Sequence, residues 1–177
     1  MDATLRIEMM PDSETVLPAY APHASFEELY RREYPNLVAV AHALTGASHA
    51  AEDLVQDTMV RAFLNWDKVG RYNRPGGWCL RVLTNACRSW WRRESTAQRW
   101  LARQRRDEPW QSGPSGADLA FWAVVRQLPE RPRRVVVLFY AGERTVTEIA
   151  SILNVPDGTV KSDLARSRAA ILAELER

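Results

Sequence analysis

Cysteine is scarce in this sequence, which holds only Cys79 and Cys87. Their spacing matches neither a CxxC redox pair nor a zinc knuckle, so we expect two buried, reduced thiols. The three histidines, His23, His42 and His49, have no cysteine or aspartate cluster beside them. We therefore expect neither a metal ion nor a cofactor.

Long hydrophobic runs are also missing. None approaches the roughly 20 apolar residues that a membrane-spanning helix requires, so we expect no membrane insertion. The first residues, MDATLRIEMMPDSE, carry acids where a signal peptide would carry bases, which favours a cytoplasmic protein. With 46% hydrophobic and 26% charged residues, the 177-residue chain has the composition of a folded protein and room for one ordinary domain or two small ones.

Catalytic groupings are absent too. Outside the adjacent Glu52 and Asp53, we find no cluster of carboxylates and no nucleophile beside a base. We therefore expect no catalytic residues, no enzyme and no small-molecule substrate.

Positive charge, by contrast, is concentrated in one stretch. Residues 71–106 hold ten arginines against one acid, Glu94, a net charge of +9, whereas residues 1–25 have a net charge of −3. Such segregation favours a phosphate-binding surface over a solvated arginine face that has no partner. Four tryptophans in the same stretch would suit stacking on bases. They are Trp78, Trp90, Trp91 and Trp100.

Hydrophobic periodicity predicts an all-α fold. SFEE is a capping box that begins a helix at Ser25, with Pro35 starting a further segment that ends at Gly46. A second helix over 49–66 has an apolar face and an opposite polar ridge. The apolar residues, expected in the core, are Ala51, Leu54, Val55, Met59, Ala62, Phe63 and Trp66. The polar ridge is formed by Asp53, Gln56, Asp57 and Arg61.

Glycine and proline divide the rest of the chain. We expect a loop over 67–77, a third helix over 78–93, and a Pro/Gly/Ser-rich linker around 107–118. Asp118 then caps a helix that Pro129 ends. RPRRVVVLFYAG has strand propensity, but an early proline and the lack of a partner strand favour helix. TVTE (145–148) is a second capping box, and Asp157 caps the final helix.

The last two helices, joined by the short turn NVPD, form a predicted helix-turn-helix, although a simple helical hairpin fits the pattern too. Val160, Leu164, Ile171 and Leu175 form the packed stripe of the second helix. Its outward residues are Lys161, Ser162, Ala165 and Arg166.

Two features near the start of this last helix concern DNA phosphates. Gly158 and Thr159 are expected to offer free backbone amides to a phosphate. Asp163 is predicted beside the reading face, paired weakly with Arg166 and reducing the positive charge on one flank.

Three stretches together resemble the extracytoplasmic-function (ECF) sigma factors, group IV of the bacterial sigma-70-type family. They are LTGASHAAEDLVQDTMVRAF (44–63), GGWCLRVLTNACRSWWRR (76–93) and LPERPRRVVVLFYAGERTVTEIASILNVPDGTVKSDLARSRAAI (128–171). The likeness covers nearly all of 26–175, and AEDLVQD with GTVKS is a highly specific combination. It implies a protein that binds core RNA polymerase and directs it to promoters.

The resemblance implies roles for the first domain. Asp53, Gln56 and Asp57 would dock on the clamp coiled coil of the largest polymerase subunit. Asn85 would lie in the pocket for a base flipped from the minus-ten element, with Trp78 packed beneath the preceding loop. The side chains implied to hold phosphates are Arg81, Arg88, Arg92 and Arg93.

For the second domain, the resemblance implies minus-thirty-five contacts on the helix that begins near Thr159. The residues are Lys161, Ser162, Ala165 and Arg166, the four that the helical pattern turns outward. The sequence departs from the family at Asp163, where a basic residue is common, and at Ala165, where a large side chain is frequent. An anti-sigma factor is a further partner that the family implies.

The expected organisation is therefore two small helical domains. A disordered tail (1–24) precedes sigma region 2 (25–94), and a flexible linker (95–117) leads to sigma region 4 (118–177). The alternative is a stand-alone helix-turn-helix regulator that acts without replacing a sigma subunit. That alternative leaves the EDLVQD ridge and the tryptophan-arginine helix without a role.

Overall fold

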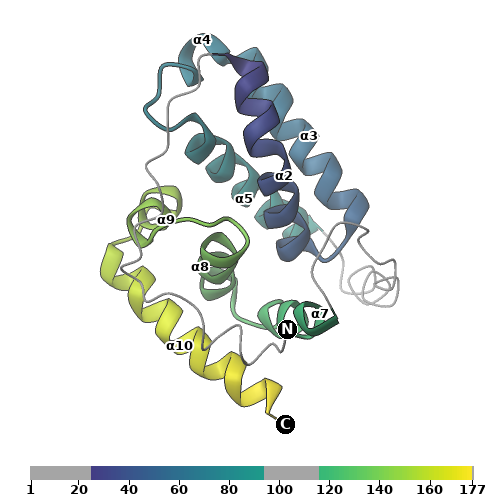
Figure 1. The fold of residues 1–177 in the computed structure, drawn as a ribbon, viewed down its shortest axis with the longest axis vertical. Coiled ribbons are helices and arrows are strands. Elements are labelled where there is room, and N and C mark those ends of the chain that lie inside the picture. Colours follow the sequence, from purple (N-terminus) through teal and green to yellow (C-terminus); the bar gives the residue numbers. More distant parts are fainter. Residues whose placement is uncertain (1–24, 94–115, 177) are drawn as a thin grey trace. The chain divides into compact units, whose positions relative to one another are not determined.

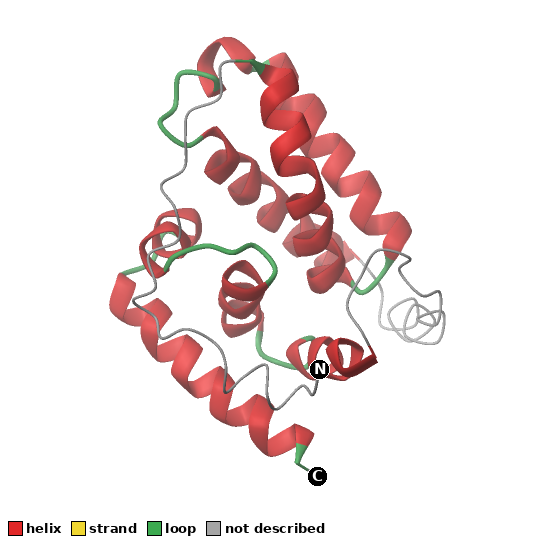
Figure 2. Cartoon of the chain, viewed as in Figure 1, coloured by secondary structure: helices red, strands yellow, loops and turns green. Residues whose placement is uncertain are grey.

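The computed structural model describes residues 25–93 and 116–176, and the regular elements in these two ranges are all helices (Figures 1 and 2). The helices group into two compact units, one before and one after the undescribed segment 94–115. The predicted all-α fold with two helical domains is confirmed. The predicted tail and most of the linker lie outside the described residues.

Within residues 25–93, the first unit contains the helices α2 (Phe26–Thr45), α3 (Ser48–Leu64), the single turn α4 (Trp66–Val69), and α5 (Pro75–Arg93). The three long helices pack pairwise against one another, so each contributes one apolar stripe to a shared core. Fully buried side chains come from all three. They include Leu29, Leu37, Val40, Val55, Leu80 and Leu83.

Helix α2 begins and ends as its sequence predicts. The Ser25 side chain accepts a hydrogen bond from the Glu28 amide at 3.2 Å, and Gly46 ends the helix in the left-handed conformation with φ 70°. The expected new segment at Pro35 is wrong, because α2 runs through this residue without a break. Pro35 and Arg31 are both exposed, so water can reach the backbone carbonyl that a proline leaves without its usual donor.

The loop expected over 67–77 is shorter in the structure. Residues 66–69 form the helical turn α4, and α5 begins at Pro75 rather than near residue 78. Proline suits the first position of a helix because its fixed φ is helical and its missing N–H would have no partner there. Of the three glycines that suggested a loop, Gly76 and Gly77 therefore lie in the first turn of α5.

The assignment of Phe63 to the core is also wrong. Its ring makes an edge contact with Phe26, with centroids 5.2 Å apart, but 59% of the residue stays exposed. Phe26 is the first residue of α2, so this contact lies at the very end of the facing helix.

Both cysteines are free and buried in the first unit, as predicted. Burial raises the pKa of the Cys79 thiol to about 12, and the negative Glu33 carboxylate adds to that shift. A thiol with so high a pKa stays protonated and unreactive at neutral pH. In the described part of the chain, no helix is both long and apolar enough to cross a membrane.

The second unit contains α7 (Gly116–Val125), α8 (Glu130–Tyr140), α9 (Val146–Leu153) and α10 (Asp157–Leu175). Helix α10 packs against the other three, and its inner stripe fills the middle of the unit. Other buried side chains close the core around it. They include Phe121, Val125, Val136, Leu138 and Ile149.

Helical predictions for this unit hold except at two helix starts and at the end of α7, which lies at Val125 instead of just before Pro129. VVVLFY is helical, and the Thr145 and Glu148 pair forms the full capping box of α9. Asp118 does not cap α7, which already begins at Gly116. Asp157 does not cap α10 either: it is the first helical residue, and its carboxylate accepts from the Thr147 hydroxyl at 3.0 Å instead.

Two glycines of this unit allow a matched test of its packing. A Cβ on Gly142 would lie 2.6 Å from the Leu138 carbonyl oxygen, whereas a Cβ on Gly158 would meet nothing within 4 Å. We expect Gly142→Ala to lower the unfolding free energy by about 1–3 kcal/mol. Gly158→Ala should leave it unchanged or raise it by up to about 1 kcal/mol, because alanine favours helix. Thermal and urea unfolding of both variants would measure this, and equal stabilities would contradict the described packing.

Candidate functional site

Helix α3 presents a polar face to solvent. Asp53, Gln56 and Asp57 are all exposed, and their spacing of three and four residues aligns them along one side. The opposite side of α3 is anchored in the core by residues such as Val55 and Met59. The predicted polar ridge is therefore a real surface, held in place by the packing beneath it.

The same face continues as an apolar surface that the sequence reasoning missed. Val60, Phe63 and Leu64 are 55%, 59% and 73% exposed. They follow the polar residues at helical spacing, so the helical wheel could have revealed them. Exposed large apolar side chains next to one another are typical of protein-binding surfaces. We call the whole face, from Asp53 to Leu64, the α3 ridge.

Helix α5 carries the basic face of the first unit. Trp78, Arg81, Asn85, Arg88 and Arg92 follow one another at intervals of three and four residues. The arginines and Asn85 are exposed, and Trp78 is partly buried at the start of the helix. Arg93 is exposed as well, with its Nε donating to the Ser89 carbonyl at 3.3 Å. On the opposite side, Cys79, Leu83 and Cys87 are buried.

Two of the tryptophans in this stretch have contacts at the end of α5. The Trp91 indole donates to the Leu44 carbonyl at 3.0 Å, which ties the end of α5 to the end of α2. Trp90 contacts Trp91 edge to face, with centroids 5.3 Å apart. Trp100 lies outside the described residues. Trp91 thus has a structural role that the sequence pattern did not indicate.

Helices α9 and α10, with the short turn between them, form the predicted helix-turn-helix. Asn154 ends α9 in the left-handed conformation with φ 56°, and two residues later Pro156 leads into α10. The hydrogen bond from Thr147 to Asp157 links the first turn of α9 to the first turn of α10. This contact fixes where the second helix starts relative to the first.

The outer face of α10 matches its prediction. Lys161, Ser162, Ala165 and Arg166 are exposed, and Thr159 is partly exposed. The free amide expected at Thr159 is wrong, because this N–H donates to the Pro156 carbonyl at 2.9 Å. Such a short-range bond tightens the first turn of the helix.

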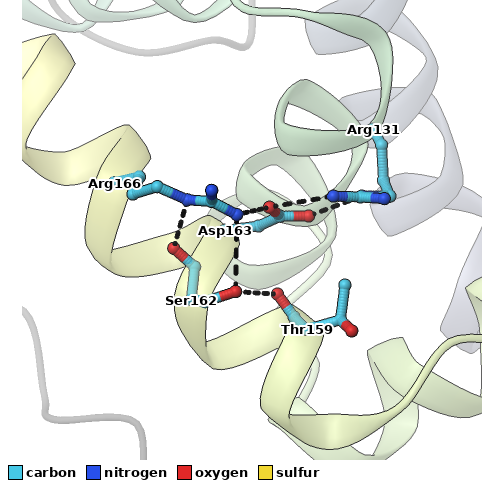
Figure 3. Close-up of polar contacts among 5 residues, drawn as sticks. All are labelled: Arg131, Thr159, Ser162, Asp163 and Arg166. Atoms are coloured by element: carbon cyan, nitrogen blue, oxygen red, sulfur yellow. Dashed lines mark hydrogen bonds and ion pairs between the residues drawn. The ribbon is translucent and has the colours of Figure 1, made fainter.

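Asp163 differs most from its prediction. The residue is only 1% exposed, although it was expected beside the reading face. Its carboxylate accepts from Arg131 Nε of α8 and from Arg166 Nη2 of α10, both at 2.8 Å (Figure 3). The predicted pairing with Arg166 is confirmed, but Asp163 also joins two helices. A buried carboxylate needs such partners, because an unpaired buried charge is strongly destabilising.

Metal-binding side chains do not gather on these faces. Among the described residues, no three His, Cys, Asp or Glu side chains lie close enough to hold a metal ion. The chemistry that the faces offer is recognition: an acidic and apolar surface on α3, and guanidinium, amide and hydroxyl groups on α5 and α10. Guanidinium and hydroxyl groups are typical ligands of phosphates and base edges.

Comparisons with known proteins agree across both units. Residues 29–97 match the family described as Sigma-70 region 2, and residues 118–171 match the one described as Sigma-70, region 4. The RNA polymerase sigma-E factor of Streptomyces avermitilis is 29% identical over 168 residues, which cover 89% of each chain. The ECF RNA polymerase sigma factor EcfG of Rhodopseudomonas palustris is 30% identical over 145 residues, 80% of each chain.

A solved structure extends this likeness to the fold. It is the sigma factor RpoE in complex with the anti-sigma factor NepR from Bartonella quintana. The likeness has a TM-score of 0.67 at 25% sequence identity and covers 85% of this chain and 95% of that one. The chain therefore belongs to the ECF RNA polymerase sigma factors, non-enzymatic subunits that bind core polymerase and direct the initiation of transcription at promoters.

Proposed function

We propose that this sigma factor divides its work among the three exposed faces. The α3 ridge binds core polymerase, the basic face of α5 captures the melted minus-ten strand, and α10 reads the minus-thirty-five element. The observation that carries this proposal is that each face lies on a helix whose other side is buried, so each is presented rigidly. We place sigma region 2 at 25–94 and region 4 at 118–177, with a tail over 1–24 and a linker over 95–117.

The polymerase contact is assigned to Asp53, Gln56 and Asp57, which meet the clamp coiled coil of the largest subunit. The exposed Val60 and Phe63 continue the same face and add apolar area to it. Polar groups beside an apolar centre are the usual composition of a specific protein interface.

The minus-ten contact is assigned to α5. Asn85 binds a base flipped out of the duplex, and Trp78 supports the loop before the helix. Around them lie the phosphate-binding groups Arg81, Arg88, Arg92 and Arg93. Support comes from their common exposure on one side of α5. A binder for the extruded base compensates the few kcal/mol that unstacking costs.

The minus-thirty-five contact is assigned to Thr159, Lys161, Ser162, Ala165 and Arg166. A helix of this kind enters the major groove with its first turns, where side chains reach base edges. The protein acts in the cytoplasm, where the transcription machinery is. An anti-sigma factor restrains it, as NepR is bound to the related RpoE.

A test of the polymerase contact uses a double change on the α3 ridge. Asp53→Ala with Gln56→Ala should weaken binding to core RNA polymerase by roughly tenfold or more, because central interface residues carry most of the binding energy. Competition against wild-type protein for core enzyme would measure this. Asp67→Ala is the matched control, since Asp67 is an exposed carboxylate outside α3. Unchanged affinity in the double variant would remove the assignment.

Strand opening provides a separate test. Asn85→Ala should slow promoter opening by roughly tenfold, about 1.4 kcal/mol, because the flipped base loses its hydrogen-bonding partner. Permanganate footprinting of the melted region measures opening directly. Ser89→Ala, one turn later on the exposed side of α5, should leave the footprint intact. A normal footprint with Asn85→Ala would count against the pocket.

Upstream reading is tested with Lys161→Ala. Transcription from templates with a matched upstream element should fall by an amount equivalent to about 1–3 kcal/mol if a base contact is lost. Templates with a mismatched element serve as the internal control and should be affected much less. Equal losses on both templates would make Lys161 a phosphate anchor instead of a reading residue.

A further inference from the structure

We infer that Asp163 is a positioning residue for Arg166, and that it sets the base preference at the upstream element by holding this guanidinium ready for DNA. The inference rests on the proposed role of α10 in reading the minus-thirty-five element. It begins from an unexpected observation. Asp163 is only 1% exposed, although Ser162 and Arg166 on the same helix face outward.

The contacts of Arg166 define its orientation (Figure 3). Its Nε donates to the Ser162 carbonyl at 3.2 Å, and its Nη2 donates to Asp163 Oδ1 at 2.8 Å. A longer contact of 3.5 Å joins Nη2 to the Ser162 hydroxyl, which itself donates to the Thr159 carbonyl at 3.0 Å. One edge of the guanidinium is therefore held against α10.

The remaining nitrogen, Nη1, is left for a ligand. No dashed line in Figure 3 reaches it, and the Arg166 side chain is 72% exposed despite its bonds. An arginine usually loses much rotamer freedom when it binds a base edge. Here most of that freedom is lost before DNA arrives, so a guanine O6 or N7 in the major groove meets donors that are already aimed.

A purely structural tie between helices would not need Arg166. Arg131 of α8 already makes a two-pronged contact with the same carboxylate, with Nε to Oδ2 at 2.8 Å and Nη2 to Oδ1 at 3.4 Å. The Arg131–Asp163 contact can therefore link α8 to α10 without any contribution from Arg166. Asp163 Oδ1 also accepts from the outward-facing Arg166. Orienting Arg166 is therefore a role separate from linking the two helices.

The charge of Asp163 predicts an unusual combination of effects. Neutralising the carboxylate raises the local positive charge by one, which should strengthen sequence-independent binding to phosphates and steepen its dependence on salt. It also releases Arg166, which should weaken discrimination between bases. A variant that had only lost its fold would lose both kinds of binding.

The experiment uses the full chain assembled with core RNA polymerase and genomic DNA fragments from the source bacterium as templates. Sequencing of run-off transcripts gives the base preference at each upstream position. Arg166→Ala should flatten the preference at one or two positions by roughly 5- to 150-fold. Asp163→Asn should flatten the same positions by at least about threefold, and should add nothing further when combined with Arg166→Ala.

The matched control is Arg131→Ala, which removes the other ion-pair partner of Asp163. It should lower the melting temperature of the protein and leave the base preferences intact. If Asp163→Asn does not fold, Arg131→Ala with Asp163→Ala replaces it, because that pair of changes leaves no unpaired buried charge. Holoenzyme binding to a promoter-free duplex at several salt concentrations measures the sequence-independent affinity for DNA.

Three results would overturn the inference, and they are distinguishable. If Arg166→Ala flattens a preference that Asp163→Asn leaves intact, Asp163 has no positioning role and the assignment of α10 survives. If neither Arg166→Ala nor Lys161→Ala changes any upstream preference, the proposed reading face itself is wrong. An equal flattening by Arg131→Ala would also reduce Asp163 to a structural tie.

Discussion

Burial of one face of each long helix is the constraint on which both units depend. The units are small, so the helices that contact partners must also fill the core. On α5, Leu83 and Cys87 are buried while Arg81 and Arg88 point outward from the same turns. On α10, Val160 and Leu164 are buried between exposed recognition residues. The position of each recognition side chain is therefore set by apolar contacts on the other side of its helix.

Helix α10 adds a polar anchor to this apolar one. A buried carboxylate is costly unless charged donors compensate it, and Asp163 has two, Arg131 and Arg166. Both arginines stay partly in water, which limits their own desolvation. A basic residue at this position could not accept from either guanidinium. The orientation of Arg166 on α10 is therefore tied to a carboxylate at position 163.

The three faces differ in chemistry, which agrees with the separate partners that we propose for them. The α3 ridge combines carboxylates with exposed apolar residues such as Phe63 and Leu64, which suits a protein surface and repels phosphates. The faces of α5 and α10 carry guanidinium and small polar groups suited to DNA. Each unit can present its own surface because it has its own core. A sigma factor binds both core polymerase and promoter DNA, so separate surfaces suit its partners.

The sequence by itself determined the features that arise within one helix or one turn. The capping box at Thr145, the left-handed end at Gly46 and the outward set on α10 all follow from local hydrogen bonding and helical periodicity. The polar half of the α3 ridge could be predicted in the same way. Even the family resemblance depends on runs such as GTVKS, which are local patterns.

Only the tertiary structure decided which side chains find partners from distant helices. Phe63 contacts Phe26 of α2 yet stays mostly exposed, and Trp91 is engaged because α2 ends beside it. Asp163 is buried because α8 brings Arg131 against it from 32 residues away in the chain. A helical wheel treats its helix as isolated, so it cannot tell a residue that faces water from one that faces a neighbouring helix.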